Sequence, residues 1–255
     1  MDVKGHSAIV TGGGSGLGEA TAKMLAAKGA KVAVFDMNMK GADRVAKEIG
    51  GVAIECNVAD VPSTEKAFAA AKQAVGAARV LVNCAGIGSG ELLVKKDGSP
   101  SGVELFLKTV AVNLFGTFNC MRLGAAEMTK LAPLADEERG VIINTTSVAA
   151  YEGQIGQIAY SASKGGVVGL TLPAARELGR HGIRVMTIAP GYVQTPLLDA
   201  VPEHMRTALF SSQVFPNKRF GKAEEYAHLC LSIIENPMLN GSVIRLDAGT
   251  RMPPK

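Results

Sequence analysis

The stretch Ser7–Gly18, SAIVTGGGSGLG, decides how this chain is expected to fold. Its first five residues suit a buried strand, its glycines suit a tight turn, and an alanine- and leucine-rich helical stretch follows at once. Glycines let backbone amides at the start of such a helix approach a phosphate, and the helix dipole favours the negative charge. The spacing is G-x-x-x-G-x-G and not the common G-x-G-x-x-G, so the turn alone is weak evidence for dinucleotide binding.

The alternation of strand and helix continues along the whole chain. Short apolar, β-rich runs are separated by stretches of helical length, which predicts βαβ units and a parallel sheet covered on both faces. Right-handed crossovers then give an α/β, Rossmann-type, doubly wound sheet. The predicted strands are Ser7–Thr11, Lys31–Asp36, Val52–Asn57, Val80–Asn83, Val141–Thr145, Arg184–Ala189 and Val243–Asp247. The predicted helices are Gly18–Lys28, Lys40–Ile49, Ser63–Val75, Glu104–Leu131, Ala159–Leu178 and Ala223–Glu235.

Two stretches interrupt this alternation, but no linker divides the chain, so we expect one domain over residues 1–255. Gly88–Gly102 is predicted to be a surface insertion loop, and Thr195–Phe220, apolar and with three prolines, a mobile substrate lid. The apolar side chains of the second stretch suit an aliphatic chain or a steroid, or else they pack on the domain or on a neighbouring subunit. They are Leu197, Leu198, Val201, Met205, Leu209 and Phe210, and the cations available for substrate phosphates are Lys95, Lys96 and Arg206.

Composition excludes several classes of function. Hydrophobic residues make up 47% and charged residues 20%, which is typical of a soluble globular protein with a large core. The net charge of +4 is not concentrated in a basic block, so dedicated nucleic-acid binding is not expected, and no apolar run is long enough to span a membrane. The four cysteines and four histidines show no metal-ligand spacing, so we expect reduced thiols and no metal. The first residues enter a strand at once and leave no room for a signal or transit peptide, so we expect a cytoplasmic protein.

Asp36 ends the second predicted strand, 18 residues after Gly18. A carboxylate at this place accepts hydrogen bonds from both hydroxyls of an adenosine ribose and repels a 2′-phosphate. The next residues, Met37 and Asn38, supply no cation for such a phosphate. NAD is therefore favoured over NADP, with an Asp that caps the following helix as the alternative interpretation.

Tyr160 and Lys164 lie four residues apart in a predicted helix, so the phenol and the ammonium share one helix face. A nearby cation stabilises a phenolate and lowers the pKa of the tyrosine, which suits the phenol for proton transfer. Taken alone, the pair equally suits a half-buried tyrosine beside a lysine that reaches solvent.

Together these motifs resemble the short-chain dehydrogenase/reductase family. The resemblance rests on T-G-x-x-x-G-x-G at Thr11–Gly18, the N-x-A-G turn at Asn83–Gly86, and the order of Asn113, Ser147, Tyr160, Lys164 and Pro190-Gly191. Four further segments are similar to its type 2 3-hydroxyacyl-CoA dehydrogenase subfamily, also called 17β-hydroxysteroid dehydrogenase type 10, which has an insertion where Gly88–Gly102 falls. These segments are Val141–Glu152, Ala159–Gly169, Gly182–Pro190 and Ile233–Asp247.

The resemblance implies a role for each motif residue. Tyr160 would donate or accept the proton at the substrate oxygen, Ser147 would hydrogen-bond that oxygen, and Lys164 would hold the nicotinamide ribose and keep the pKa of Tyr160 low. Asn113 would anchor a proton-relaying water. For Ser147 the alternative is a cap at the strand end, and for Asn113 it is a polar group satisfying a helix kink. The residues implied in NAD binding are Gly12, Ser15, Gly16, Leu17, Gly18, Asp36, Asn57, Val58, Cys84, Ala85, Gly86, Tyr160, Lys164, Pro190, Val193 and Thr195.

Asn57 departs from the family pattern, which usually has Asp there. The amide keeps an acceptor oxygen but loses the charge that favours the adenine amino group, so we expect somewhat weaker NAD binding.

The expected reaction is reversible hydride transfer between NAD and a secondary alcohol, and the resemblance implies a 3-hydroxyacyl-CoA as the substrate. Two enzymatic alternatives are a steroid or general alcohol dehydrogenase and an acetoacetyl-CoA or ketoacyl reductase. Such reductases commonly use NADP, against which Asp36 argues. An alternative of another class is a structural or cofactor-sensing subunit of a larger complex. The family also implies a homotetramer built on Glu104–Leu131 and Ala159–Leu178.

Overall fold

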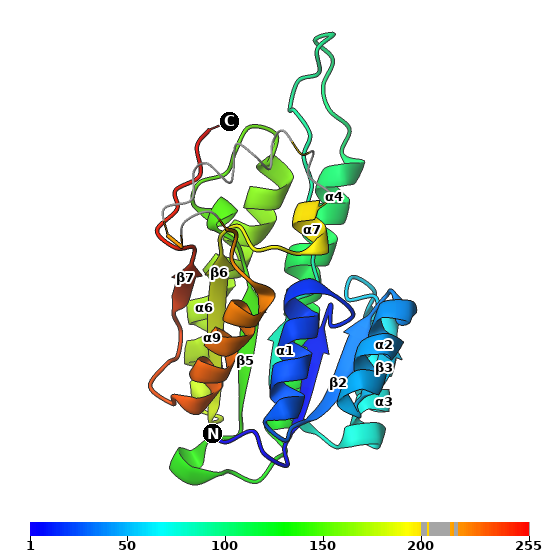
Figure 1. Ribbon diagram of the computed structural model, residues 1–255, viewed down its shortest axis with the longest axis vertical. Helices are drawn as coiled ribbons and strands as arrows, with labels where there is room; N and C mark the ends of the chain where they lie inside the picture. The colour runs from blue at the N-terminus through cyan, green and yellow to red at the C-terminus, as the bar shows by residue number, and fades with distance from the viewer. Residues whose placement is uncertain (200–202, 204–214, 217–218, 255) are drawn as a thin grey trace.

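The computed structural model describes residues 1–199, 203, 215–216 and 219–254. A seven-stranded parallel sheet with the order β3-β2-β1-β4-β5-β6-β7 forms its centre, with helices on both faces (Figure 1). The doubly wound Rossmann-type fold predicted from the alternation of strands and helices is thus confirmed. The strands are β1 (Ser7–Thr11), β2 (Lys31–Asp36), β3 (Val52–Glu55), β4 (Ala78–Asn83), β5 (Gly140–Thr145), β6 (Ile183–Pro190) and β7 (Val243–Leu246).

The core lies in two layers, one on each face of the sheet, because successive strand side chains point to opposite faces. On β4, Val80 and Val82 pack in one layer and Leu81 in the other. The first layer is closed by α1, α2 and α9, and the second by α3, α5 and α6. These helices are α1 (Gly16–Ala27), α2 (Met39–Ile49), α3 (Val61–Val75), α5 (Gly116–Met128), α6 (Ile158–Gly179) and α9 (Ala223–Glu235).

The strand order reverses between β1 and β4, where Thr11 pairs with Asn83. The connections after these two strands leave the sheet in opposite directions, which opens a crevice at their carboxyl ends. The glycine turn at Gly12 and the turn that begins at Cys84 therefore face each other across this crevice.

The long helix expected over Glu104–Leu131 is found as a continuous helical segment, but it ends at Met128 and is not α-helical throughout. The segment consists of α4 (Glu104–Val110), a π-helical turn over Ala111–Phe115 and then α5, which ends at Met128. The π turn contains the buried Asn113, whose side chain bonds the backbone of Ile87. This long-range contact accompanies the change of helical phase, and π turns of this kind are frequent at functional sites.

Residues 88–102 project away from the body beside α4, with an antiparallel bridge between Val94 and Pro100 near the tip (Figure 1). Of the predicted lid, Thr195–Phe220, the structure describes α7 (Pro196–Asp199) and a few further residues. Residues 200–202, 204–214 and 217–218, which include Val201, Met205, Arg206, Leu209 and Phe210, lie outside the described residues. In the part of the chain that is described, no helix is long and apolar enough to cross a membrane.

Candidate functional site

The glycine turn between β1 and α1 is packed so closely that side chains do not fit. Gly12 has a φ of +63°, and a Cβ atom there would lie 2.8 Å from the Cα of Ala85. A Cβ atom at Gly18 would overlap the carbonyl oxygen of Gly12. Ser15 precedes α1, is exposed, and makes no side-chain cap bond, so the first amides of the helix lack that partner. A glycine cradle at an uncapped helix N-terminus fits the pyrophosphate of a dinucleotide.

Asp36 is held against this turn from the end of β2. Its two oxygens accept hydrogen bonds from the backbone amides of Gly14 and Asn38, both at 2.9 Å. Since each carboxylate oxygen has a further lone pair, the group can still accept the two hydroxyls of a ribose. Asn38 caps α2 by accepting a bond from Gly41, so the alternative role of Asp36 as the helix cap is not observed.

The turn after β4 connects the glycine cradle to the predicted catalytic residues. The amides of Cys84 and Ala85 bond the backbone and the side chain of Thr11, both at 3.2 Å. A Cβ atom at Gly86 would lie 3.2 Å from Oδ1 of Asn113 and 3.5 Å from Nζ of Lys164. Cys84, Ala85 and Gly86 thus form a wall shared by both halves of the site.

Lys164 is buried, with 5% of its surface exposed. Its Nζ donates a hydrogen bond to the Thr145 carbonyl at 2.9 Å and lies 5.8 Å from the centroid of the Tyr160 ring. The spacing predicted that the two side chains share a helix face, and the structure places them side by side. Burial lowers the pKa of Lys164 to about 8, because a charged ammonium is poorly solvated there.

Asn113 is also fully buried and ties several parts of the site together. Its Oδ1 accepts a bond from the Ile87 amide at 2.8 Å, and its Nδ2 donates to the Ile87 carbonyl at 3.0 Å and to Ser163 Oγ at 3.1 Å. Ser163 in turn donates to the Tyr160 carbonyl at 2.7 Å. Both amide hydrogens are therefore used by protein groups, so the side chain fixes the start of α6 relative to the turn after β4.

Ser147 follows β5 and faces Tyr160 in the first turn of α6. Its Oγ accepts a bond from the Ala149 amide at 3.1 Å, so Ser147 caps the short helix Val148–Ala150 as well. Burial raises the pKa of Tyr160, and the hydrogen bond with Ser147 offsets only part of this rise. The expectation of a lowered pKa is therefore not met, because desolvation of the phenol outweighs the effect of the neighbouring residues.

Comparison with known proteins identifies the family. A family profile described as short chain dehydrogenase matches residues 6–206. The chain belongs to the short-chain dehydrogenase family. Membership implies an oxidoreductase with a nicotinamide cofactor, NAD or NADP. The human 3-hydroxyacyl-CoA dehydrogenase type-2 is 50% identical over 255 residues, covering 99% of this chain and 97% of that protein.

Further relatives agree with this assignment. The crystal structure of 3-hydroxyacyl-CoA dehydrogenase type-2 from Mycobacterium avium is 42% identical, covers 98% of either chain and superposes with a TM-score of 0.93. The 3-oxoacyl-[acyl-carrier-protein] reductase of Rattus norvegicus is 34% identical over 95% of this chain and 97% of that protein.

The remaining residues that are predicted to bind the cofactor of this short-chain dehydrogenase lie at different places around the site. Thr195 contacts the glycine turn, since a Cβ atom at Gly16 would lie 3.3 Å from its side chain. Pro190 is the buried last residue of β6, and Val193 forms a bridge with Gly221. Leu17 packs against the core layer of α1. Pro190 and Val193 thus lie at the carboxyl end of β6, and Thr195 lies beside the turn that follows β1.

Asn57 and Val58 lie after β3, and both are engaged by the protein. Oδ1 of Asn57 accepts a bond from the Ala59 amide at 3.1 Å. Val58 is buried, and a Cβ atom at Gly116 would lie 2.6 Å from its side chain. Because the side chain of Val58 is packed inside the protein, only its backbone could contact an adenine.

Two residues outside the predicted set take part in the site, Thr145 and Ser163. The carbonyl of Thr145 receives the Lys164 ammonium, while its hydroxyl lies 2.7 Å from the hydroxyl of the buried Tyr226. Ser163 links Asn113 to the backbone of Tyr160. In the sequence these two residues stand out only because they carry hydroxyl groups close to the motif residues. Thr145 lies two positions before Ser147, and Ser163 lies three positions after Tyr160. Among the described residues, no group of three His, Cys, Asp or Glu side chains could hold a metal ion.

Proposed function

We propose that this short-chain dehydrogenase interconverts a 3-hydroxyacyl-CoA and the 3-ketoacyl-CoA with NAD as the cofactor. The observation that carries the proposal is an unbroken series of neighbouring groups in the folded protein. It runs from the glycine cradle through Gly86 to Lys164, Tyr160 and Ser147. The type-2 3-hydroxyacyl-CoA dehydrogenases, similar over the whole chain, support the substrate class.

NAD, when bound, supplies the hydride acceptor for alcohol oxidation and the hydride donor for ketone reduction. The phenol of Tyr160 and the hydroxyl of Ser147 hold the substrate oxygen by two hydrogen bonds. Because burial raises the pKa of Tyr160, the phenol is protonated at neutral pH and ready to donate a proton to a ketone oxygen. Lys164 would hold a ribose hydroxyl of the cofactor, and its ammonium would favour the phenolate when the proton leaves Tyr160.

The preference for NAD over NADP rests on charge at the adenosine end of the cradle. The Asp36 carboxylate lies against Gly14 and repels a 2′-phosphate. A cation also reaches this turn, since Arg44 donates a bond to the Gly14 carbonyl at 3.3 Å. Glu19 binds the same guanidinium through both oxygens, at 2.7 and 2.6 Å, and so neutralises its charge toward a phosphate.

The test is a kinetic panel with purified protein. The substrates are 3-hydroxyacyl-CoAs of several chain lengths and steroid alcohols, each with NAD and with NADP. We expect the highest kcat/KM with an acyl-CoA and NAD. Equal or better turnover of the steroids would reject the substrate class, and a clear preference for NADP would indicate a ketoacyl reductase instead. Absence of turnover with every substrate would favour the structural or cofactor-sensing alternative.

We also propose a homotetramer. Apolar side chains are exposed on the two long helical segments that the family implies as an interface, among them Phe115, Phe118 and Leu172. Covering such side chains removes apolar surface from water. Light scattering is expected to give four times the chain mass of 26.4 kDa, and a monomer would contradict the proposal.

A further inference from the structure

Ser147 and Tyr160 are joined by a loop, residues 148–157, that the hydrophobic core holds only in part. Val148 and Ala149 are buried, but Tyr151 and Ile155 are 48% and 58% exposed. The loop nevertheless connects the two residues whose hydroxyls are proposed to hold the substrate oxygen. Contacts other than apolar burial must therefore define its position.

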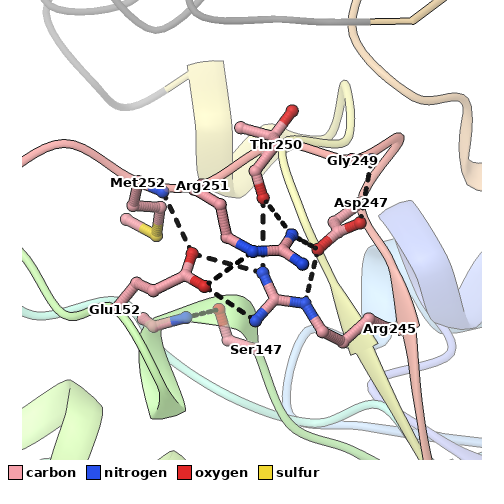
Figure 2. Close-up of polar contacts among 9 residues, drawn as sticks. Ser147, Glu152, Arg245, Asp247, Gly249, Thr250, Arg251 and Met252 are labelled. Atoms are coloured by element: carbon pink, nitrogen blue, oxygen red, sulfur yellow. Dashed lines mark hydrogen bonds and ion pairs between the residues drawn. The ribbon is translucent and has the colours of Figure 1, made fainter.

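The end of β7 and the C-terminal segment after it supply such contacts through Glu152 (Figure 2). Arg245 donates two hydrogen bonds to the Glu152 carboxylate, at 2.8 and 3.2 Å. The Nε of Arg251 lies 3.3 Å from the same carboxylate, and the Met252 amide donates to it at 3.1 Å. The bonds from Arg245 lower the pKa of Glu152, which is therefore ionised at neutral pH.

The two arginines are themselves held by a second carboxylate. Asp247 accepts bonds from Arg245 at 2.6 Å and from Arg251 at 3.1 Å, and its other oxygen accepts the Gly249 amide. Figure 2 shows both guanidinium groups between Glu152 and Asp247. We call Glu152, Arg245, Asp247 and Arg251 the charge clasp. Positive and negative groups alternate in it, and its net charge is zero.

Two hydrogen bonds to backbone carbonyls of the C-terminal residues hold the same loop. The Gln154 side chain donates to the Pro253 carbonyl, and the Ile155 amide donates to the Pro254 carbonyl, both at 3.1 Å. On its other side the loop accepts a bond at Gly156 from the Glu91 amide at 2.8 Å. The loop between Ser147 and Tyr160 is thus held by two segments that are far away in the sequence.

An isolated ion pair at a surface contributes little to stability, but a bidentate arginine within a network of charges fixes geometry well. Geometry matters here because misplacing a reacting group by about 1 Å can slow a reaction by about a hundredfold. If the loop were freed from the clasp, we would expect the separation between Ser147 and Tyr160 to vary.

We propose that Glu152, held by Arg245 and Arg251, is a positioning residue that fixes Ser147 relative to Tyr160. It acts through the loop and touches neither the substrate oxygen nor the cofactor. The expected effect on kcat rests on the proposed function. The contacts of the clasp do not, because they are part of the folded structure.

The test compares Glu152→Gln with Glu127→Gln in the full-length chain. Glu127 is a matched control, because it also binds two cations, Lys72 at 2.6 Å and Lys130 at 2.7 Å, but near the C-terminal end of α5. Acetoacetyl-CoA and NADH serve as the assay pair. We expect Glu152→Gln to lower kcat about tenfold or more by misplacing the reacting groups, while the KM for NADH stays near that of the wild type. Glu127→Gln should keep both constants.

Hydrogen exchange provides a second measurement that needs no substrate. Amides of residues 148–157 should exchange faster in Glu152→Gln than in the wild type, and at the wild-type rate in Glu127→Gln. A wild-type kcat together with unchanged exchange in Glu152→Gln would overturn the inference. If the wild-type protein turns over no acyl-CoA, the proposed function fails while the exchange measurement still tests the clasp.

A second variant guards against misfolding. Arg251 is 61% exposed at its side chain, so Arg251→Gln removes one link of the clasp without opening the core. A smaller loss of kcat with faster loop exchange supports the inference, and wild-type values for both contradict it.

Discussion

The buried ammonium of Lys164 should make the stability of this protein depend on pH in a way that Lys164→Met removes. The pKa of Lys164 falls from 10.5 to about 8 in the folded protein because of burial. Between these two values the unfolded chain binds more protons than the folded one, so this group makes the free energy of unfolding rise with pH. The cost of the charged ammonium is fully present below about pH 8 and disappears above about pH 10.5.

The magnitude follows from the size of the pKa shift. One unit corresponds to about 1.4 kcal/mol, so the charged Lys164 costs about 3 kcal/mol near neutral pH. At about pH 10 only about 1 kcal/mol of this cost remains, which leaves a change of about 2 kcal/mol across the window. The methionine variant has no titratable group at this position, so this pH-dependent cost is absent from it. It also loses the bond to the Thr145 carbonyl, which costs about 1 kcal/mol.

Urea unfolding of both proteins, followed by circular dichroism at equal protein concentration, measures the effect. The quantity is the difference in unfolding free energy, wild type minus Lys164→Met, at about pH 7 and about pH 10. Other buried groups, such as Tyr226, titrate in both proteins and cancel in this difference. We expect the difference to increase by about 2 kcal/mol toward the wild type at high pH. A difference independent of pH would refute the argument that Lys164 is charged and poorly solvated in the fold.

Three further variants test the site. Tyr160→Phe should lower kcat by about a hundredfold or more while NAD still binds, because the proton donor is lost; normal turnover would contradict the role of the phenol. Asp36→Ala should raise the KM for NAD and reduce the preference for NAD over NADP, measured as the ratio of kcat/KM values, and an unchanged ratio would exclude Asp36 from the ribose site. Gly18→Ala should lose about 2 kcal/mol of stability in urea unfolding and weaken NAD binding, because its Cβ atom would overlap the Gly12 carbonyl. Gly90→Ala, where nothing lies within 4 Å, is the control and should change neither property.

The strands were predicted well from the sequence because their signal is local. Apolar runs such as Val141–Thr145 are bounded by polar or glycine residues, and the structure extends this strand by only one residue, to Gly140. The glycine turn could also be predicted from the sequence, because the need for small residues at Gly12 and Gly18 depends on a few neighbouring atoms.

Features that depend on distant segments were not predicted. The π turn over Ala111–Phe115 accompanies the bond from Asn113 to Ile87, which lies 26 residues earlier. The pKa of Tyr160 was expected to be lowered by Lys164, but burial by the assembled protein raises it. The link between Glu152 and Arg245 joins residues 93 positions apart, and no local pattern in the sequence pairs them.

The sequence by itself determined the order of strands and helices, the glycine cradle, the strand-end Asp36 and the helical pair of Tyr160 and Lys164. Each of these depends on residues within a turn or two of one another, where spacing along the chain translates directly into spacing in space. Only the tertiary structure decided how deeply Lys164 is buried, what its ammonium bonds, and how the C-terminal segment holds the loop between Ser147 and Tyr160. Desolvation and long-range ion pairs depend on which segments pack together, and no local pattern records that packing.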